Sequence, residues 1–197
     1  MRTFVVLAAA FVLFSVWQHH RREQNEGRLA LAASALAERE VRVGCPGFWT
    51  RLVEITPYSG WVSFDEHGLP ADETTLSAST CRSLEKLWRS AEPPSFTCLE
   101  SASCTGDEVG IVNGLVTLAH ESWHLRGVRR EAQTQCYALQ TTELAARLLG
   151  IAPEEARRVA AYAATRDTTL PFGEYRSAEC RPGGAFDLRP QTLEWPG

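Results

Sequence analysis

The fold and the function are best inferred from one stretch of the sequence, Leu118–Gln140, which reads LAHESWHLRGVRREAQTQCYALQ. It contains His120-Glu121-Ser122-Trp123-His124, an HExxH pattern. Residues four apart lie on one face of a helix, so the two imidazoles can hold one zinc ion. A glutamate directly after the first histidine can act on a water molecule at that metal. The pattern predicts a zinc site; the alternative is a helix that carries two histidines and no metal.

Helical spacing continues on both sides of the motif. Asp107-Glu108 place acidic residues at the positive end of a helix, and apolar residues at helical intervals carry this helix to the motif. Gly127 follows, and glycine is the usual residue where a helix ends and the chain turns. A second helix is expected from about Arg129 to Leu149, and a third from Pro153 to about Arg166. The remainder, Thr168–Gly197, is rich in proline and glycine and is expected to be irregular.

A catalytic zinc site needs a third protein ligand, and Glu131 is the leading candidate. On an unbroken helix it would lie roughly 10 Å along the axis from His124, too far to share one ion. A break at Gly127 would instead put Glu131 in the first turn of the next helix, where it can face back. Glu143 is the rival, although it lies about 18 Å further along that helix. His67 remains a third possibility.

These residues resemble the zincin metallopeptidase superfamily over roughly Val109–Leu149. HESWH followed by Gly127 is similar to the metzincin pattern, although Arg130 stands at the position of the third ligand in that group. The run Glu131-Ala132-Gln133-Thr134-Gln135 resembles the start of the second helix in gluzincins, with Gln135 where an acidic residue is usual. The resemblance implies a small zincin-like fold that pairs a short sheet with helices.

The resemblance also implies a reaction, the zinc-dependent hydrolysis of peptide bonds in a peptide or protein substrate. His120, His124 and Glu131 would bind Zn²⁺. Glu121, as general base, would take a proton from a zinc-bound water that attacks the peptide carbonyl. The alternative function is a non-catalytic zinc-binding or disulfide-stabilised domain of the cell envelope.

Further residues could assist such a site. Gln135 could orient a metal ligand from behind. Tyr175, Arg176 and Arg129 are candidates for stabilising an oxyanion, because their side chains can donate hydrogen bonds or carry positive charge. For each of these residues, a surface hydrogen bond is the competing interpretation.

The six cysteines all follow the N-terminal apolar run: Cys45, Cys81, Cys98, Cys104, Cys136 and Cys180. None forms a CxxC pair, so zinc ribbons and thioredoxin-like motifs are not indicated. An even number behind an export-like segment favours disulfides in an oxidising compartment. We favour a bond between Cys136 and Cys180, which would tie the C-terminal segment to the second helix. The alternative is six reduced thiols in a cytosolic protein.

The N-terminal stretch Thr3–Trp17 (TFVVLAAAFVLFSVW) is continuously apolar and flanked by basic residues. It is short for a full membrane span and long for the core of a signal peptide. No convincing cleavage site follows closely. We therefore expect an uncleaved membrane anchor that holds the protein on the extracytoplasmic face, with a secreted protein as the alternative.

Three regions are expected: an anchor or signal segment over residues 1–25, a helical stalk over 26–44, and a zincin-like metal-binding domain over 45–197. In the third region, β-branched and aromatic residues predict a hairpin formed by Phe48–Ile55 and Trp61–Phe64. A loop over Glu66–Asp72 follows.

A helix capped by Ser79 or Thr80 is expected to run to about Ser90. The predicted class is α+β and mostly α, with an apolar N-terminal helix, a small sheet and a disulfide-bonded helical core. The chain has 197 residues, 44% of them hydrophobic, as expected for a globular protein. Its net charge of -4 and lack of basic runs disfavour nucleic acid as a partner.

Overall fold

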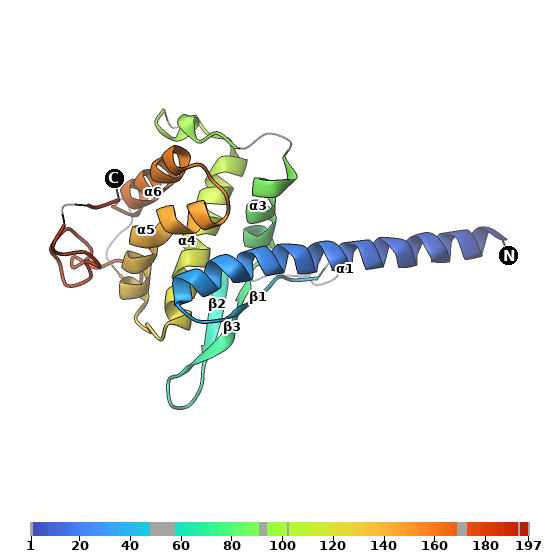
Figure 1. Cartoon of the computed structure of the whole chain (residues 1–197), viewed down its shortest axis with the longest axis horizontal. Coiled ribbons are helices and arrows are strands. Elements are labelled where there is room, and N and C mark those ends of the chain that lie inside the picture. Colours follow the sequence, from blue (N-terminus) through green and yellow to red (C-terminus); the bar gives the residue numbers. More distant parts are fainter. Residues whose placement is uncertain are drawn as a thin grey trace.

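The structure is a computed structural model. It describes residues 2–47, 58–90, 94–101, 103–168, 173–192 and 194–196, and for residues 2–9 and 168 it describes the backbone alone. Helices and one small three-stranded sheet make the fold α+β and mostly α, as the sequence predicts (Figure 1).

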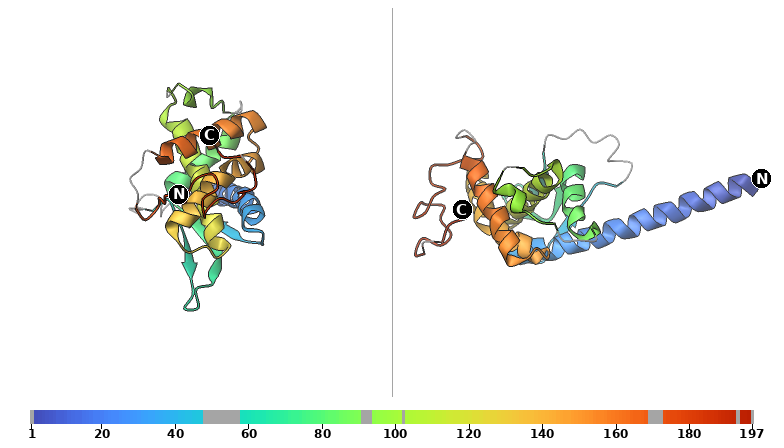
Figure 2. Two further views of the ribbon diagram at one scale, coloured as in Figure 1. Left: turned by 90° about the vertical axis from the view of Figure 1, so that its left-hand side faces the viewer. Right: turned by 90° about the horizontal axis from the view of Figure 1, so that it is seen from above.

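Helix α1 (Arg2–Ala37) is continuous; its first half extends away from the body and its second half packs into it (Figures 1 and 2). Residues 26–37 of the helical segment expected over 26–44 belong to this same helix, and its packed half buries an apolar stripe at helical spacing. In the described part of the chain, no helix is both long enough and apolar enough to cross a bilayer, so the predicted transmembrane helix is not found. The stripe consists of Leu29, Ala32, Ala33, Leu36 and Ala37.

The sheet contains β1 (Arg42–Gly44), β2 (Gly60–Phe64) and β3 (Pro70–Leu76) in the order β1-β3-β2. The central strand β3 is parallel to β1 and antiparallel to β2. Among the described residues, β2 is therefore an edge strand, with one side free of ladder partners.

The strand predicted at Trp61–Phe64 is confirmed, but its partner is β3. The predicted partner, Phe48–Ile55, lies outside the described residues. The loop expected over Glu66–Asp72 is partly wrong, since β3 begins at Pro70. In β3, Ala71, Asp72 and Glu73 are exposed and only Thr74 and Leu76, at the end, are buried, so the strand has little apolar alternation.

Within the described residues, four α-helices and one short 3₁₀ helix follow the sheet. They are α3 (Ala78–Arg89), η1 (Thr97–Leu99), α4 (Gly106–Leu125), α5 (Glu131–Leu148) and α6 (Pro153–Thr168). Helix α4 lies at the centre and contacts the other α-helices and strands β2 and β3 (Figure 1).

The ends of these helices mostly agree with the expected ones. The start of α4 is fixed by a capping box between Thr105 and Glu108, next to the predicted acidic start. The cap of α3 is Ser77, which accepts from the Thr80 backbone N–H, so neither Ser79 nor Thr80 is the cap. Thr80 donates its hydroxyl to the Ser59 carbonyl instead.

All six cysteines form disulfides, which confirms the expected oxidised state: Cys45–Cys81, Cys98–Cys104 and Cys136–Cys180. The pairing that the sequence favoured, Cys136 with Cys180, is present. It ties α5 to the C-terminal segment, whose described residues, 173–192 and 194–196, contain no helix or named strand.

Candidate metal centre

The turn after α4 folds the chain back on itself. Gly127 has a φ of +92°, which a residue without a side chain adopts readily. Its N–H donates to the His124 carbonyl (2.8 Å), and the Val128 N–H donates to the Trp123 carbonyl (3.1 Å), the Schellman pattern of a helix end. Helix α5 then begins at Glu131, which consequently faces the end of α4.

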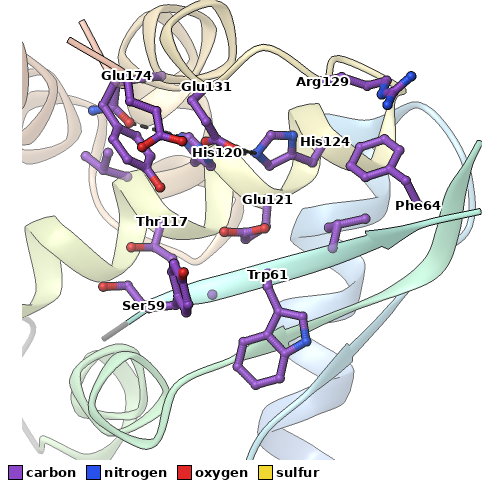
Figure 3. A pocket seen from close by; sticks show the side chains of 16 residues that line it. Ser59, Trp61, Phe64, Thr117, His120, Glu121, His124, Arg129, Glu131 and Glu174 are labelled. Carbon is purple, nitrogen blue, oxygen red and sulfur yellow. Dashed lines mark hydrogen bonds and ion pairs between the residues drawn. The ribbon is translucent and has the colours of Figure 1, made fainter. Parts of the chain in front are cut away.

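Three side chains meet at this turn. The two Nε2 atoms of His120 and His124 lie 3.0 Å apart (Figure 3). Oε2 of Glu131 lies 3.0 Å from His120 Nε2 and 3.3 Å from His124 Nε2. With Zn–N bonds of about 2.0–2.1 Å, neighbouring ligands in a tetrahedral shell are about 3.3 Å apart. The spacing of the three atoms therefore suits a single zinc ion.

The opposite ring nitrogens are already engaged. His124 Nδ1 donates to the Val128 carbonyl (2.7 Å), and His120 Nδ1 donates to Oε1 of Gln135 (3.1 Å). Because these oxygens only accept, a neutral ring at either position carries its proton on Nδ1 and turns its Nε2 lone pair towards Glu131. Two ring nitrogens and a carboxylate oxygen that all accept repel one another at this distance, and a cation bound between them stabilises the arrangement.

Electrostatics at the cluster favour the forms that bind metal. Burial, followed by the neighbouring His120, lowers the pKa of His124 and so favours the neutral imidazole. When Nε2 of His120 carries a proton, its hydrogen bond to Glu131 is the main cause that lowers the pKa of Glu131, and the charge of His124 lowers it further, which favours the carboxylate. Metal binding requires these two protonation states.

Glu121 is a buried acid in the same place. Its side chain is only 4% exposed, and its Oε2 has no hydrogen-bond partner among the described residues. Burial raises the pKa of Glu121 to about 7; the charge of His120 opposes this rise and that of Glu131 adds to it. A carboxyl group poised near neutral pH suits proton transfer.

Strand β2 passes directly over Glu121. A Cβ atom at Gly60 would lie 2.9 Å from both Cγ and Oε1 of Glu121, closer than real contacts allow. Only glycine at this position leaves room for the carboxyl group where it stands.

These side chains open into a cleft of about 810 Å³ between β2, α4, the start of α5 and the C-terminal segment (Figure 3). The residues that line it are Tyr58, Ser59, Gly60, Trp61, Val62, Phe64, Val116, Thr117, His120, Glu121, His124, Arg129, Glu131, Gln135, Glu174 and Tyr175.

The three oxyanion candidates lie in different places. The ring of Tyr175 is 5.9 Å from that of His120, inside the cleft. Burial, and then the charge of Glu131, raises the pKa of Tyr175, so its hydroxyl keeps its proton and can donate. Arg129 lies over the Phe64 ring, at the other end of the cleft, whereas Arg176 does not line it.

The rival ligands are not part of the cluster. His67 is exposed on the turn between β2 and β3, 3.5 Å from Glu66. Glu143 pairs with Arg147 on the surface of α5. Among the described residues, one other group has metal-ligand spacing, Cys98, Cys104 and Glu108, but its two sulfur atoms are joined in a disulfide.

Sequence reasoning missed two residues that support the site. Gly60 makes room for Glu121, and Asp167 of α6 accepts from Nε2 of Gln135 (3.2 Å). Neither lies near the HExxH pattern in the sequence, and no motif marks either of them. Only the packing of β2 and α6 against α4 and α5 brings them to the site.

Comparison with models of protein families, with curated proteins and with solved structures finds no match for this chain.

Proposed function

We propose that this protein is a zinc-dependent peptidase in which His120, His124 and Glu131 hold the metal and Glu121 is the general base. The observation that carries the proposal is the convergence of three acceptor atoms within 3.0–3.3 Å, beside a buried carboxyl group with no partner among the described residues. A closed structural site would need a fourth side chain. Among the described residues the cluster offers three, and it borders an open cleft, which favours an enzyme over a non-catalytic zinc domain.

Zinc held in this way supplies a Lewis acid for the substrate carbonyl and lowers the pKa of a water molecule. Glu121 takes a proton from the attacking water as the oxygen adds to the carbonyl carbon. It then gives this proton to the amine nitrogen as the C–N bond breaks. A cation beside Glu121 also favours its ionised form, so metal binding prepares the base.

The substrate proposed for the cleft is an extended peptide that lies along β2. The outer side of this strand is unpaired among the described residues, and an added strand can bind such an edge through main-chain hydrogen bonds. A peptide on this edge passes over Glu121 and the metal ligands. Tyr175 can donate from the opposite side to a developing oxyanion.

The protein is proposed to act outside the reducing cytoplasm, because its three disulfides persist only in oxidising compartments. The proposal that the N-terminal segment associates with a membrane is supported by the first half of α1. This half projects from the body (Figure 2). Phe11, Leu13 and Trp17 on it are each at least half exposed. Amphipathic aromatic rings such as that of tryptophan favour the membrane interface.

The test combines zinc content with hydrolysis of a fluorogenic peptide library by the purified, oxidised chain. We expect about one zinc per chain, marked loss of zinc in Glu131→Ala, and retention in Glu143→Ala, a control on the same helix. Glu121→Gln should keep the zinc and lose at least about a hundredfold in hydrolysis. Zinc with full activity in Glu121→Gln would exclude the proposed base. Zinc without any hydrolysis by the parent would favour the non-catalytic alternative.

A further inference from the structure

Asp167 lies near the C-terminal end of α6, outside the cleft and almost fully buried. Its Oδ1 accepts a hydrogen bond from Nε2 of Gln135 (3.2 Å). The other end of the same amide, Oε1, accepts from His120 Nδ1 (3.1 Å). The three side chains form a continuous chain from α6 through α5 to a proposed metal ligand on α4.

The orientation of the Gln135 amide decides where His120 carries its proton. With Oε1 facing the ring, Nδ1 must donate, and Nε2 keeps its lone pair. With the amide turned round, Nδ1 would have to accept, and the proton would move to Nε2, where it would block a metal. Glutamine alone can adopt either orientation, so its second partner makes the choice.

An ionised carboxylate only accepts hydrogen bonds, and it therefore permits one orientation of Gln135. The pKa of Asp167 is raised, mainly by burial, and the hydrogen bond from Gln135 and the positive charge of Arg176 limit this rise. In the structure its Oδ1 is the acceptor for Nε2 of Gln135. Asp167 is thus suited to hold the amide with Nε2 towards itself and Oε1 towards His120.

We infer that Asp167 is a positioning residue for the metal centre, which acts through Gln135 to keep the His120 proton on Nδ1 and Nε2 free for zinc. The inference rests on the proposed zinc site. The competing explanation is that the Asp167–Gln135 hydrogen bond only fastens α6 to α5. The two explanations make different predictions. A hydrogen bond that only holds α6 against α5 has the same effect on zinc binding whichever end of the Gln135 amide faces His120.

A double-mutant cycle on the purified full chain separates the two, with zinc affinity measured by competition with a chromophoric chelator. Asp167→Asn keeps the shape but can both donate and accept, so it no longer dictates the amide orientation. We expect it to weaken zinc binding about tenfold, within the range for residues behind metal ligands. In a Gln135→Glu background, the carboxylate accepts from His120 without help, so Asp167→Asn should cost no affinity; it can even gain some, because it removes the repulsion between the new carboxylate and that of Asp167.

Asp187→Asn is the matched control, because Asp187 caps backbone N–H groups in the C-terminal segment, away from His120. It should leave zinc affinity unchanged. Equal losses from Asp167→Asn in both backgrounds, or no loss in either, would overturn the inference. If the parent chain binds no zinc, the proposed function fails, but nitrogen NMR of His120 in the metal-free chain still tests Asp167. The proton should be on Nδ1 in the parent and shared with Nε2 in Asp167→Asn; an unchanged tautomer would contradict the inference.

Discussion

Nδ1 of His124 donates to the carbonyl oxygen of Val128 over 2.7 Å, and this hydrogen bond joins the helix end to the metal cluster. The carbonyl reaches the ring because Gly127, the residue before Val128, turns the chain with a φ of +92°. The same turn brings Glu131 back towards α4. The backbone conformation at Gly127 therefore orients the proposed ligand His124 and places the proposed ligand Glu131 beside it.

Gly127→Ala should weaken zinc binding about tenfold, as loss of a partner behind a metal ligand does. No atom crowds the position, so the cost comes from the left-handed backbone, about 1–2 kcal/mol for a residue with a Cβ. Relaxing that strain moves the Val128 carbonyl away from His124. Zinc affinity and the free energy of unfolding of the metal-free chain are both measured.

Gly150→Ala is the control for this prediction. Gly150 ends α5 with nearly the same φ, +91°, and also has open space around it, but it makes no contact with the cluster. Both variants should lose similar stability, and only Gly127→Ala should lose zinc affinity. Equal losses of zinc affinity would show that the turn has no special role at the metal centre.

Gly60→Ala should lower hydrolysis about a hundredfold with the zinc content unchanged. The new Cβ would displace the carboxyl of Glu121 from the position where it faces the metal cluster, and a shift of about 1 Å at a catalytic group costs this much. Gly44→Ala on β1 is the matched control, because its Cβ would meet the half-exposed end of Glu73 at 3.1 Å. Full activity in Gly60→Ala would argue against Glu121 as the base.

The arrangement around the HExxH pattern could be predicted because its signals are local. The apolar spacing of α4 and the glycine at 127 lie within one short stretch. They suffice to predict the helix, its break and a Glu131 that faces back, as the structure has them. The ligand role of these residues remains a prediction.

The rest depends on contacts between segments that are distant in the sequence. In β3 only Thr74 and Leu76 are buried, so its sequence is like that of a loop. The segment forms a strand because it pairs with β1 and β2 on either side. The buried stripe on α1 is rich in alanine, which favours a helix whether it is buried or exposed. The sequence therefore predicts the helix but not which of its faces is buried. Gly60 and Asp167 acquire their roles only from partners in other elements.

Glu121 should make the stability of the metal-free chain depend on pH. Its pKa rises from the usual 4.5 to about 7 on folding, so the folded state binds its proton more tightly than the unfolded state. The stabilisation is complete below pH 4.5 and is lost as the pH rises through 7. Glu121→Gln stays neutral, so at pH 8 it should be more stable than the parent, by up to about 3 kcal/mol, and equally stable at pH 4.

Denaturant unfolding in the presence of a chelator, at pH 4 and pH 8, measures this difference. Glu143→Gln is the control, since Glu143 lies on the surface of α5 and pairs only with Arg147 among the described residues. The difference in the free energy of unfolding between Glu143→Gln and the parent should be nearly the same at pH 4 and at pH 8. A Glu121→Gln variant that tracks the parent at both pH values would contradict a raised pKa at this carboxyl.

Arg129 should favour peptides with an acidic side chain near Phe64. It lies 5.7 Å over that ring, at the end of the cleft opposite Glu174, and no carboxylate among the described residues pairs with it (Figure 3). Arg129→Gln should therefore lower kcat/KM about threefold for acidic peptides and leave neutral ones unchanged, as befits an exposed ion pair. Arg126→Gln removes the same charge from a residue that pairs with Glu38 outside the cleft, and should change neither. Equal effects of both variants would indicate a general influence of net charge.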